Sequence, residues 1–209
     1  MNAHHRAVSI RRATPEDIDA VLRLRLALLR EYPEHRIYGR LRHDAEQLAR
    51  PVFAAQLASG NEVMFLAEQG GSAIGIVRVT EASAAPFLIP DRYCYVSSAF
   101  VAPAHRRQGV LRRLLDRAVE WCRERGLSEM RLNSVGTREA ASAAWESLGF
   151  EVVEQVRVRT VESSGSRSED GLKSSLNNSL HNSLHDGLSQ RSGSSSSSNS
   201  SSSRSSGSS

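Results

Sequence analysis

The feature that most constrains this chain is a change of hydrophobic period within residues 93–125. Residues 93–101 (YCYVSSAFV) are rich in aromatic and β-branched side chains, as in a strand, and Pro103 ends that pattern. From there to Gly126 the apolar residues recur every three or four positions, as on one face of a helix. They are Val110, Leu111, Leu114, Leu115, Ala118, Val119 and Cys122. The sequence therefore predicts a strand, a tight turn and a helix in direct succession.

The turn before this helix has the composition of an anion site. The first amide groups of a helix lack intrahelical partners, and the helix dipole attracts a negative group there by about 0.3–1 kcal/mol. Arg106, Arg107, Arg112 and Arg113 add positive potential around Gly109. Gly and Pro also occur in such turns where no phosphate binds, so composition alone leaves both interpretations open.

Two short motifs in this region resemble those of a known enzyme family. Residues 106–111 (RRQGVL), preceded by 101–103 (VAP), resemble motif A of the GNAT superfamily of acetyltransferases, Q/R-x-x-G-x-G/A. Leu111 departs from the Gly or Ala of the last motif position, but backbone amides can bind phosphate whatever the side chain. Residues 145–150 (WESLGF) are similar to the family's Y-x-x-L-G-F motif. The resemblance extends over residues 8–161.

The resemblance implies acetyl-CoA as co-substrate. In the family, amides of the motif A loop bind the pyrophosphate, and the backbone of the central strand pairs with the pantetheine arm. The strand role falls here to Ala99, Phe100 and Val101. The cofactor-binding residues that the resemblance implies are Ala99, Phe100, Val101, Arg106, Arg107, Gln108, Gly109, Val110, Leu111, Arg112, Arg138 and Trp145.

The implied reaction is direct attack of an amine, from a small molecule or a peptide, on the acetyl thioester. Only about one lysine-like amine in a thousand is neutral at pH 7.4, so a general base matters for such acceptors. Family members often carry a glutamate on the central strand, where this chain has Ser97 and Ser98. A hydroxyl cannot be the base, although it could hold a relay water. Ser98 and Tyr95 are the predicted catalytic residues.

The general acid and a remoter base have several candidates. Trp145 stands where the family frequently has a tyrosine, and its indole N–H has no accessible proton to give, so Tyr95 or Tyr93 would take that role. The remoter base candidates, each of which could equally be a solvated surface group, are Glu31, His35 and Asp91.

Three functions remain open at this stage. The first is an active N-acetyltransferase, the second a CoA-binding sensor without catalysis, and the third an interaction protein whose basic helix contacts nucleic acid. A helix-turn-helix needs a helix before the basic helix, where this sequence predicts a strand. The net charge of +4 is modest, and Lys173 is the only lysine. We therefore expect a monomeric or homodimeric cytoplasmic enzyme that binds neither nucleic acid nor membrane.

The other elements predict an α/β domain with a mixed, mostly antiparallel, twisted sheet flanked by helices. Thr14 and Pro15 open a first helix, and Pro51 should end or kink a second one at 44–58. Apolar residues in the loop 83–91 could line an acceptor pocket or, as we expect, cover the core. The predicted strands are 8–11, 63–68, 73–80, 93–101, 130–135 and 151–161, with a Gly-Gly hairpin after the second.

The composition changes after residue 161. Serine makes up nearly half of residues 162–209, which predicts a disordered tail behind an acetyltransferase domain at 1–161. His181 and His185 have the spacing of a metal pair but no convincing third ligand, so no metal site is predicted. Cys94 and Cys122 fall in a strand and on the apolar face of a helix, which we interpret as small core residues and not as a disulfide framework.

Overall fold

The computed structural model describes residues 7–135 and 139–161. Within these residues the chain forms one sheet with the strand order β1-β2-β3-β4-β5. Neighbouring strands are antiparallel, except that β4 and β5 are parallel. The predicted mixed, mostly antiparallel sheet is thus confirmed. The strands are β1 Ser9–Arg12, β2 Glu62–Gln69, β3 Ser72–Ser83, β4 Arg92–Val101 and β5 Met130–Leu132.

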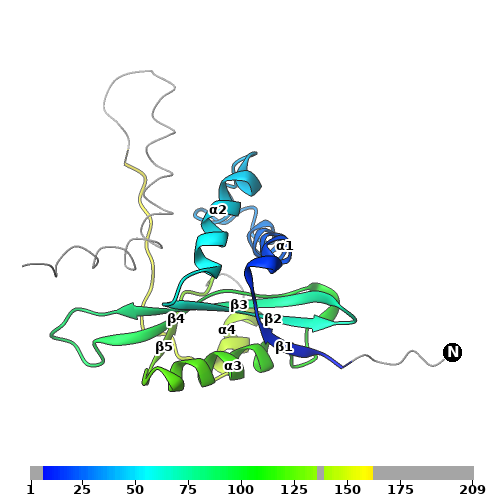
Figure 1. Cartoon of the computed structure of the whole chain (residues 1–209). Helices are drawn as coiled ribbons and strands as arrows, with labels where there is room; N and C mark the ends of the chain where they lie inside the picture. The colour runs from blue at the N-terminus through cyan, green and yellow to red at the C-terminus, as the bar shows by residue number, and fades with distance from the viewer. Residues whose placement is uncertain (1–6, 136–138, 162–209) are drawn as a thin grey trace, which may run out of the picture. The chain divides into compact units, whose positions relative to one another are not determined.

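Helices cover both faces of the sheet. Figure 1 shows α1 and α2 over one face and α3 and α4 over the other. The helices are α1 Ile18–Arg30, α2 Ala45–Leu57, α3 Val110–Glu124 and α4 Glu139–Glu146, with short 3-10 turns at Pro15–Asp17 and Pro103–His105. Each face has its own apolar core, one built on α3 and one on α1 and α2. Within the described residues, no helix has the length and apolar content to cross a membrane.

The central strands are held by a tight hairpin. Gly70 and Gly71 adopt φ values of 62° and 82°, which the two-residue turn between β2 and β3 requires and which glycine adopts without steric cost. The register that follows pairs Phe65 with Val77 and Leu66 with Ile76. Both strands are buried on both faces because helices lie on either side. The predicted hairpin is confirmed.

The start of α1 is fixed by an ion-paired cap. The Asp17 carboxylate accepts a 2.8 Å hydrogen bond from the Thr14 backbone N–H and two 2.7 Å bonds from Arg11 in β1. Arg11 also donates to Glu68 in β2. The Arg11 guanidinium is the main reason why the pKa of Asp17 falls to about 2. The predicted cap at Thr14 is found on the 3-10 turn Pro15–Asp17, which leads into α1 at Ile18, and the same contacts tie this start to the sheet.

Pro51 does not end α2. The helix runs from Ala45 to Leu57 with Pro51 inside it. Proline lacks the N–H that would bond to the carbonyl of Gln47, and helices often end at such a residue. Phe53 and Gln56 are buried on the turn that follows, and Phe53 belongs to the core under α1 and α2. The burial of these two side chains offsets the stability lost with the missing hydrogen bond.

The prediction for the last two strands of the sheet is wrong in part. Residues 151–161 form no strand, and all of them are exposed. β5 is limited to Met130–Leu132, shorter than the expected 130–135. A strand-like sequence becomes a strand only beside a ladder that accepts its hydrogen bonds, and a three-residue edge offers a short one. The valines of 151–161 consequently lie in solvent.

The loop 83–91 does not cover the core as expected. Phe87 is 84% exposed and Ile89 is fully exposed. The β3 and β4 strands extend to Ser83 and from Arg92, so this loop is the tip of a long hairpin. Its apolar residues lie beyond the area that the helices cover.

The two cysteines are bonded to each other, which corrects the prediction of separate core residues. Cys94 in β4 and Cys122 in α3 are both buried, as expected, and their sulfur atoms form a disulfide. Their Cα atoms are 6.4 Å apart, within the range that a disulfide spans. The sequence placed each cysteine on an inward face but did not show that the two faces meet.

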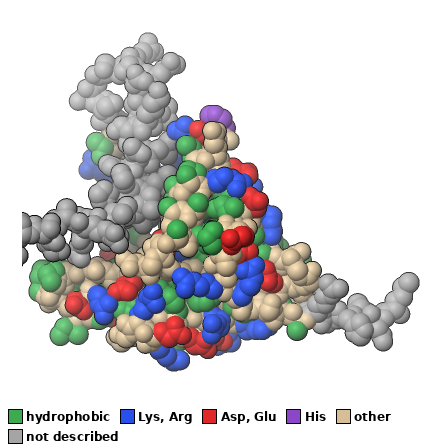
Figure 2. Space-filling model, in the orientation of Figure 1, with side chains coloured by type: hydrophobic (Ala, Val, Ile, Leu, Met, Phe, Trp, Pro, Cys, Tyr) green, Lys and Arg blue, Asp and Glu red, His purple; other side chains and the backbone are tan. Residues whose placement is uncertain are grey.

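Charges of both signs share the surface. In the view of Figure 2, basic and acidic side chains are interspersed over the sheet edge and α3, with apolar atoms between them. Nucleic-acid binding usually relies on a stripe of a single positive sign. This face therefore does not favour the nucleic-acid alternative.

We predict that the purified chain has no free thiol until it is unfolded and reduced. Ellman titration in denaturant should give no signal without reductant and two thiols per chain after reduction. Because the bond closes a 28-residue separation, Cys94→Ala should lower the free energy of unfolding by about 3–4 kcal/mol relative to the oxidised chain. Two thiols in unreduced, freshly purified protein would contradict the bond.

We predict that Asp17→Asn lowers the free energy of unfolding by about 1–2 kcal/mol at pH 7, the usual cost of losing a helix cap. The folded pKa of Asp17 is about 2, below its ordinary 3.8. The contribution is therefore complete above pH 3.8 and is lost as the pH falls through 2. Urea unfolding at several pH values measures it. Asp19→Asn, which removes an exposed partner of Arg50, should change little at any pH.

Candidate active site

The central feature of the candidate site is the point where β4 and β5 part. Their parallel pairing covers three positions, from Cys94 with Met130 to Val96 with Leu132. Beyond Val96, β4 continues to Val101, and within the described residues its backbone pairs there only with β3. Strand edges carry N–H and C=O groups that can pair with an added extended chain. Residues 97–101 therefore offer a backbone edge to a ligand.

A bulge lies at the start of this open edge. The register between β3 and β4 shifts between Ile76 and Arg78, and Ser98 has a φ of 51°. Such a φ is uncommon for a residue with a side chain. Bulges bend a strand and re-aim its side chains, and they are frequent beside functional sites. Here the bulge falls on the predicted catalytic residue Ser98.

The N-terminus of α3 follows directly from the open edge. Gly109 is the N-cap with a φ of 75°, and Arg113 N–H donates the first helical bond to its carbonyl over 3.1 Å. The amides of Val110, Leu111 and Arg112 therefore have no partner within the helix. The structure thus places the predicted cofactor loop, 106–112, beside the predicted strand residues 99–101.

The long side chains of this loop make different contacts. Arg106 donates from Nε to the Val101 carbonyl over 2.8 Å and from Nη2 to Glu31, so its side chain ties the loop to β4 and α1. Arg112 donates to the Ser147 carbonyl over 3.2 Å, which connects α3 to the segment after α4. Arg107 is exposed. Gln108 donates to the Ala104 carbonyl within the loop.

Trp145 behaves as a packing residue. It is partly buried against the core under α3 and meets the Phe150 ring edge to face at 5.5 Å. Gly149, with a φ of 88°, and the bond from Phe150 N–H to the Trp145 carbonyl end α4 at this point. Arg138, the remaining predicted cofactor residue, lies outside the described residues.

Tyr95 lies one pair before the strands part, opposite Arg131. Its phenol is partly buried, and this burial raises its pKa above 10, with Tyr38 and Tyr93 adding to the shift and Arg78 opposing it. A phenol with a raised pKa keeps its proton at neutral pH. Tyr95 can therefore donate a hydrogen bond to developing negative charge, whereas Tyr93 stacks under Arg131 at 3.9 Å.

The remoter base candidates are engaged or solvated. The Glu31 carboxylate is ion-paired with Arg106. His35 stacks on Tyr38, and its Nδ1 accepts hydrogen bonds from the N–H groups of Ile37 and Tyr38 over 3.2 and 3.1 Å. Asp91 is an exposed loop residue. Glu31 is linked to the open edge of β4 through Arg106, which also donates to the Val101 carbonyl, whereas no described contact brings His35 or Asp91 there.

Sequence reasoning missed a charged group under α1 and α2. Arg78 donates to Glu62, both almost fully buried, and its Nη1 donates to Ser97 Oγ over 3.2 Å. Burial, and then the charge of Arg78, lower the pKa of Arg25 in α1. The signal was available, because Glu62 and Arg78 are charged residues within otherwise apolar strands and such residues need partners when buried.

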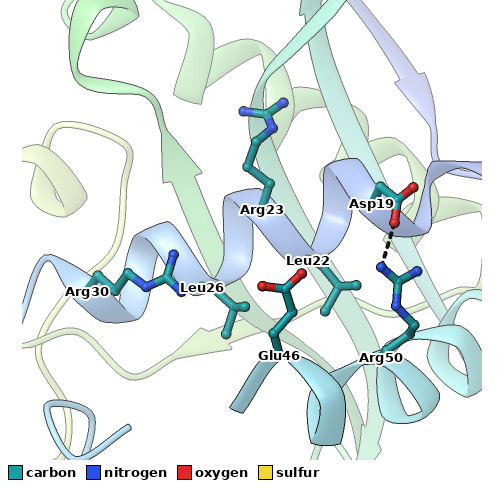
Figure 3. A pocket seen from close by; sticks show the side chains of 7 residues that line it. All are labelled: Asp19, Leu22, Arg23, Leu26, Arg30, Glu46 and Arg50. Carbon is teal, nitrogen blue, oxygen red and sulfur yellow. Dashed lines mark hydrogen bonds and ion pairs between the residues drawn. The ribbon is translucent and has the colours of Figure 1, made fainter. Parts of the chain in front are cut away.

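Two clefts lie on opposite sides of the sheet. One, of about 300 Å³, runs along α3 and the start of β5 and includes Arg112, Met130 and Phe150. The other, of about 340 Å³, lies between α1 and α2. Figure 3 shows its side chains, among them Arg30, Glu46 and the ion pair of Arg50 with Asp19. The second cleft shares no residue with the predicted site. Within the described ranges, no three His, Cys, Asp or Glu residues gather as metal ligands would.

Comparison with known proteins agrees with this geometry. The model of the family described as Acetyltransferase (GNAT) family matches residues 24–150, more than half of the chain. An aminoglycoside N(6')-acetyltransferase type 1 from Klebsiella aerogenes is 28% identical over 104 residues, which are 50% of this chain and 68% of that protein.

Solved structures share the fold. A predicted acetyltransferase from Clostridium acetobutylicum, crystallised with acetyl-CoA, superposes with a TM-score of 0.62 at 19% identity, over 73% of this chain and 96% of that one. The aminoglycoside 6'-N-acetyltransferase AAC(6')-IG from Acinetobacter haemolyticus gives a TM-score of 0.59 at 21% identity, over 75% and 99%. Identities this low show a shared fold.

We predict that Gly109→Val weakens binding of CoA, the ligand that the sequence resemblance implies, by at least tenfold. A side chain at a φ of 75° is strained by about 1–2 kcal/mol, so the loop must shift and its amides with it. Gly126→Val is the matched control, because Gly126 has a φ of 67° at the other end of α3 and open space around it. Calorimetric titration should show weaker binding for the first variant only, although both lose stability. Equal affinities would contradict the assignment.

Proposed function

Since this chain belongs to the acetyltransferase (GNAT) family, we propose that it transfers an acetyl group from acetyl-CoA to the amine of a small molecule by direct attack. The family match extends over residues 24–150, and the resemblance noted in the sequence is confirmed. GNAT enzymes use acetyl-CoA as co-substrate, and a structural relative was crystallised with it. The acceptor, the site residues and a domain boundary at residue 161 remain our proposals.

One observation carries the proposal: an open strand edge leads directly into a helix N-terminus. Within the described residues, β5 pairs with β4 only as far as Val96, and α3 begins after Gly109 with amides that have no partner within the helix. An elongated ligand that can pair with a strand at one end and carries phosphates at the other fits this succession. Acetyl-CoA has both properties, with its amide-containing pantetheine arm and its pyrophosphate.

The chemical step needs little proton transfer from the protein. The amine nitrogen attacks the thioester carbonyl carbon, a backbone N–H of β4 meets the oxyanion, and CoA leaves as its thiolate. The CoA thiolate is a fair leaving group, since a thiol pKa is about 8.5. Burial raises the pKa of the Tyr95 phenol, so it assists the thiolate by hydrogen bonding more than by full proton transfer. Ser98, at the bulge, would hold a water for the amine proton.

A CoA-binding sensor without catalysis is the second candidate. It is favoured by the absence of a carboxylate at Ser97 and Ser98 and by the packing of Trp145 on Phe150 in place of a proton-donating tyrosine. Both candidates share the cofactor site. They differ in turnover.

We predict that the full chain binds acetyl-CoA and desulfo-CoA with micromolar affinity in calorimetric titrations. With acetyl-CoA and a panel of small amines, it should release thiol in proportion to acetylated product. Binding without thiol release from any amine would favour the sensor. Folded protein that binds neither ligand would rule out both candidates.

We predict that Tyr95→Phe lowers kcat by about tenfold or more with little change in the affinity for acetyl-CoA, because it removes the phenolic donor but keeps the ring. Tyr93→Phe is the control, since Tyr93 packs under Arg131 in the same strand. Steady-state thiol release measures both. Equal rates for the two variants would remove Tyr95 from the mechanism.

A further inference from the structure

A charged cluster reaches the open edge of β4 from the side of α1 and α2. Arg78 in β3 donates from Nε to Glu62 in β2 and, over 3.2 Å, from Nη1 to Ser97 Oγ in β4. Arg78 and Glu62 are 7% and 9% exposed. Ser97 immediately precedes Ser98, so this ion pair ends beside the bulge where β4 loses its second neighbour.

A second guanidinium, that of Arg25 in α1, lies close enough to Arg78 and Glu62 for their charges to act on it. The Arg25 side chain is partly buried, lies 3.6 Å over the Phe53 ring and donates from Nη1 to Gln56. Burial, and then the charge of Arg78, lower the pKa of Arg25 to about 9, and Glu62 opposes the shift. Among the described contacts Arg25 has no carboxylate partner. We call Arg25, Gln56, Glu62, Arg78 and Ser97 the Arg25–Arg78 cluster.

The cluster is one negative charge short. It holds two guanidiniums and one carboxylate, and excess charge in a poorly solvated place is unfavourable unless an opposite charge approaches. Each guanidinium has five N–H donors, of which the bonds described above use one in Arg25 and two in Arg78. The remaining donors suit a carboxylate, which a guanidinium can bind through both oxygens.

We propose, on the basis of the proposed function, that the acceptor amine also carries a carboxylate and that the Arg25–Arg78 cluster binds it. The acceptor class is a small amino acid or another short molecule with an amine and a carboxylate. Its amine nitrogen lies at the open edge of β4 and its carboxylate at the two arginines. Arg25 is then the residue that determines specificity, because Arg78 is already held by Glu62 and Ser97.

The cluster acts on the position of the acceptor. With the acceptor carboxylate bound, two carboxylates face two guanidiniums, so the charges balance and the amine is held at the open edge. In the step itself the N–C bond forms, the C–S bond of acetyl-CoA breaks, and the amine proton passes to water or to the leaving thiolate.

Aminoglycosides are the opposing acceptor class, since a relative of this chain acetylates them according to its name. They carry several ammonium groups and need free carboxylates. Here Glu62 is taken by Arg78 and Glu31 by Arg106. Glu34 and Asp91 are exposed loop carboxylates. The charge next to Ser97 therefore repels a polycation.

The first test compares matched acceptors. Thiol release by the full chain is measured with free amino acids, with their primary amides and with kanamycin. The free acids should give a kcat/KM at least tenfold above their amides. The amine of an amide is the less basic one and has the larger neutral fraction, so basicity cannot produce this preference. Equal or faster turnover of the amides or of kanamycin overturns the proposal.

Two substitutions test whether Arg25 causes the preference for free acids. Arg25→Met should raise KM for the free acids at least tenfold. It should also reduce the ratio of kcat/KM between the free acids and their amides, which we call the gap. Arg30→Met changes an exposed arginine of the same helix outside the cluster and should keep the gap. A gap that is the same in both variants overturns the role of Arg25.

A second readout needs no acceptor. Thermal unfolding is followed in sodium acetate and in sodium chloride at equal ionic strength, and acetate should raise the midpoint of the wild type and of Arg30→Met more than that of Arg25→Met. Identical shifts in all three proteins overturn the proposal. Calorimetry with acetyl-CoA distinguishes failure of this inference from failure of the proposed function. Intact binding without a preference for carboxylates overturns this inference alone, and loss of binding in the wild type overturns the proposed function with it.

Discussion

The early end of the pairing between β4 and β5 is the constraint on which the candidate site depends. Because β5 stops at Leu132, the backbone of β4 from Ser97 to Val101 keeps one edge unpaired in the described part of the chain. The bulge at Ser98 accommodates the change of direction at that point. The short 3-10 turn Pro103–His105 then leads from β4 to the N-terminus of α3, so the strand edge and the first amides of α3 belong to one stretch of chain.

The two sides of the sheet contribute differently to this stretch. The side of α3 is apolar, and its core holds β4 and α3 together through residues such as Val96 and Leu114. The side of α1 and α2 is apolar only in part, because Arg25, Glu62 and Arg78 replace hydrocarbon near Ser97.

Sequence reasoning predicted most of the fold and the position of the turn before α3. Long periodic stretches such as 110–124, and special residues such as Gly70, Gly71 and Gly109, act locally and are therefore readable. It failed where the outcome depends on a distant partner. Residues 151–161 have the alternation of a strand but no ladder, and Pro51 is tolerated because Phe53 is buried one half-turn later. Only the fold brings Arg25 near Arg78, and only the fold brings Cys94 to Cys122.

The disulfide gives α3 a mechanical asymmetry. Cys122 lies near the C-terminal end of the helix, and Gly109 and Val110 lie at the other end, about 18 Å away at 1.5 Å per residue. The helix is thereby fastened to β4 by a covalent bond near its C-terminal end. Its N-terminal end, where the predicted phosphate loop lies, is held by packing, since Val110 is 2% exposed. Sliding of α3 along the sheet is therefore prevented by the disulfide, whereas the position of its first turn depends on the fit of side chains in the core.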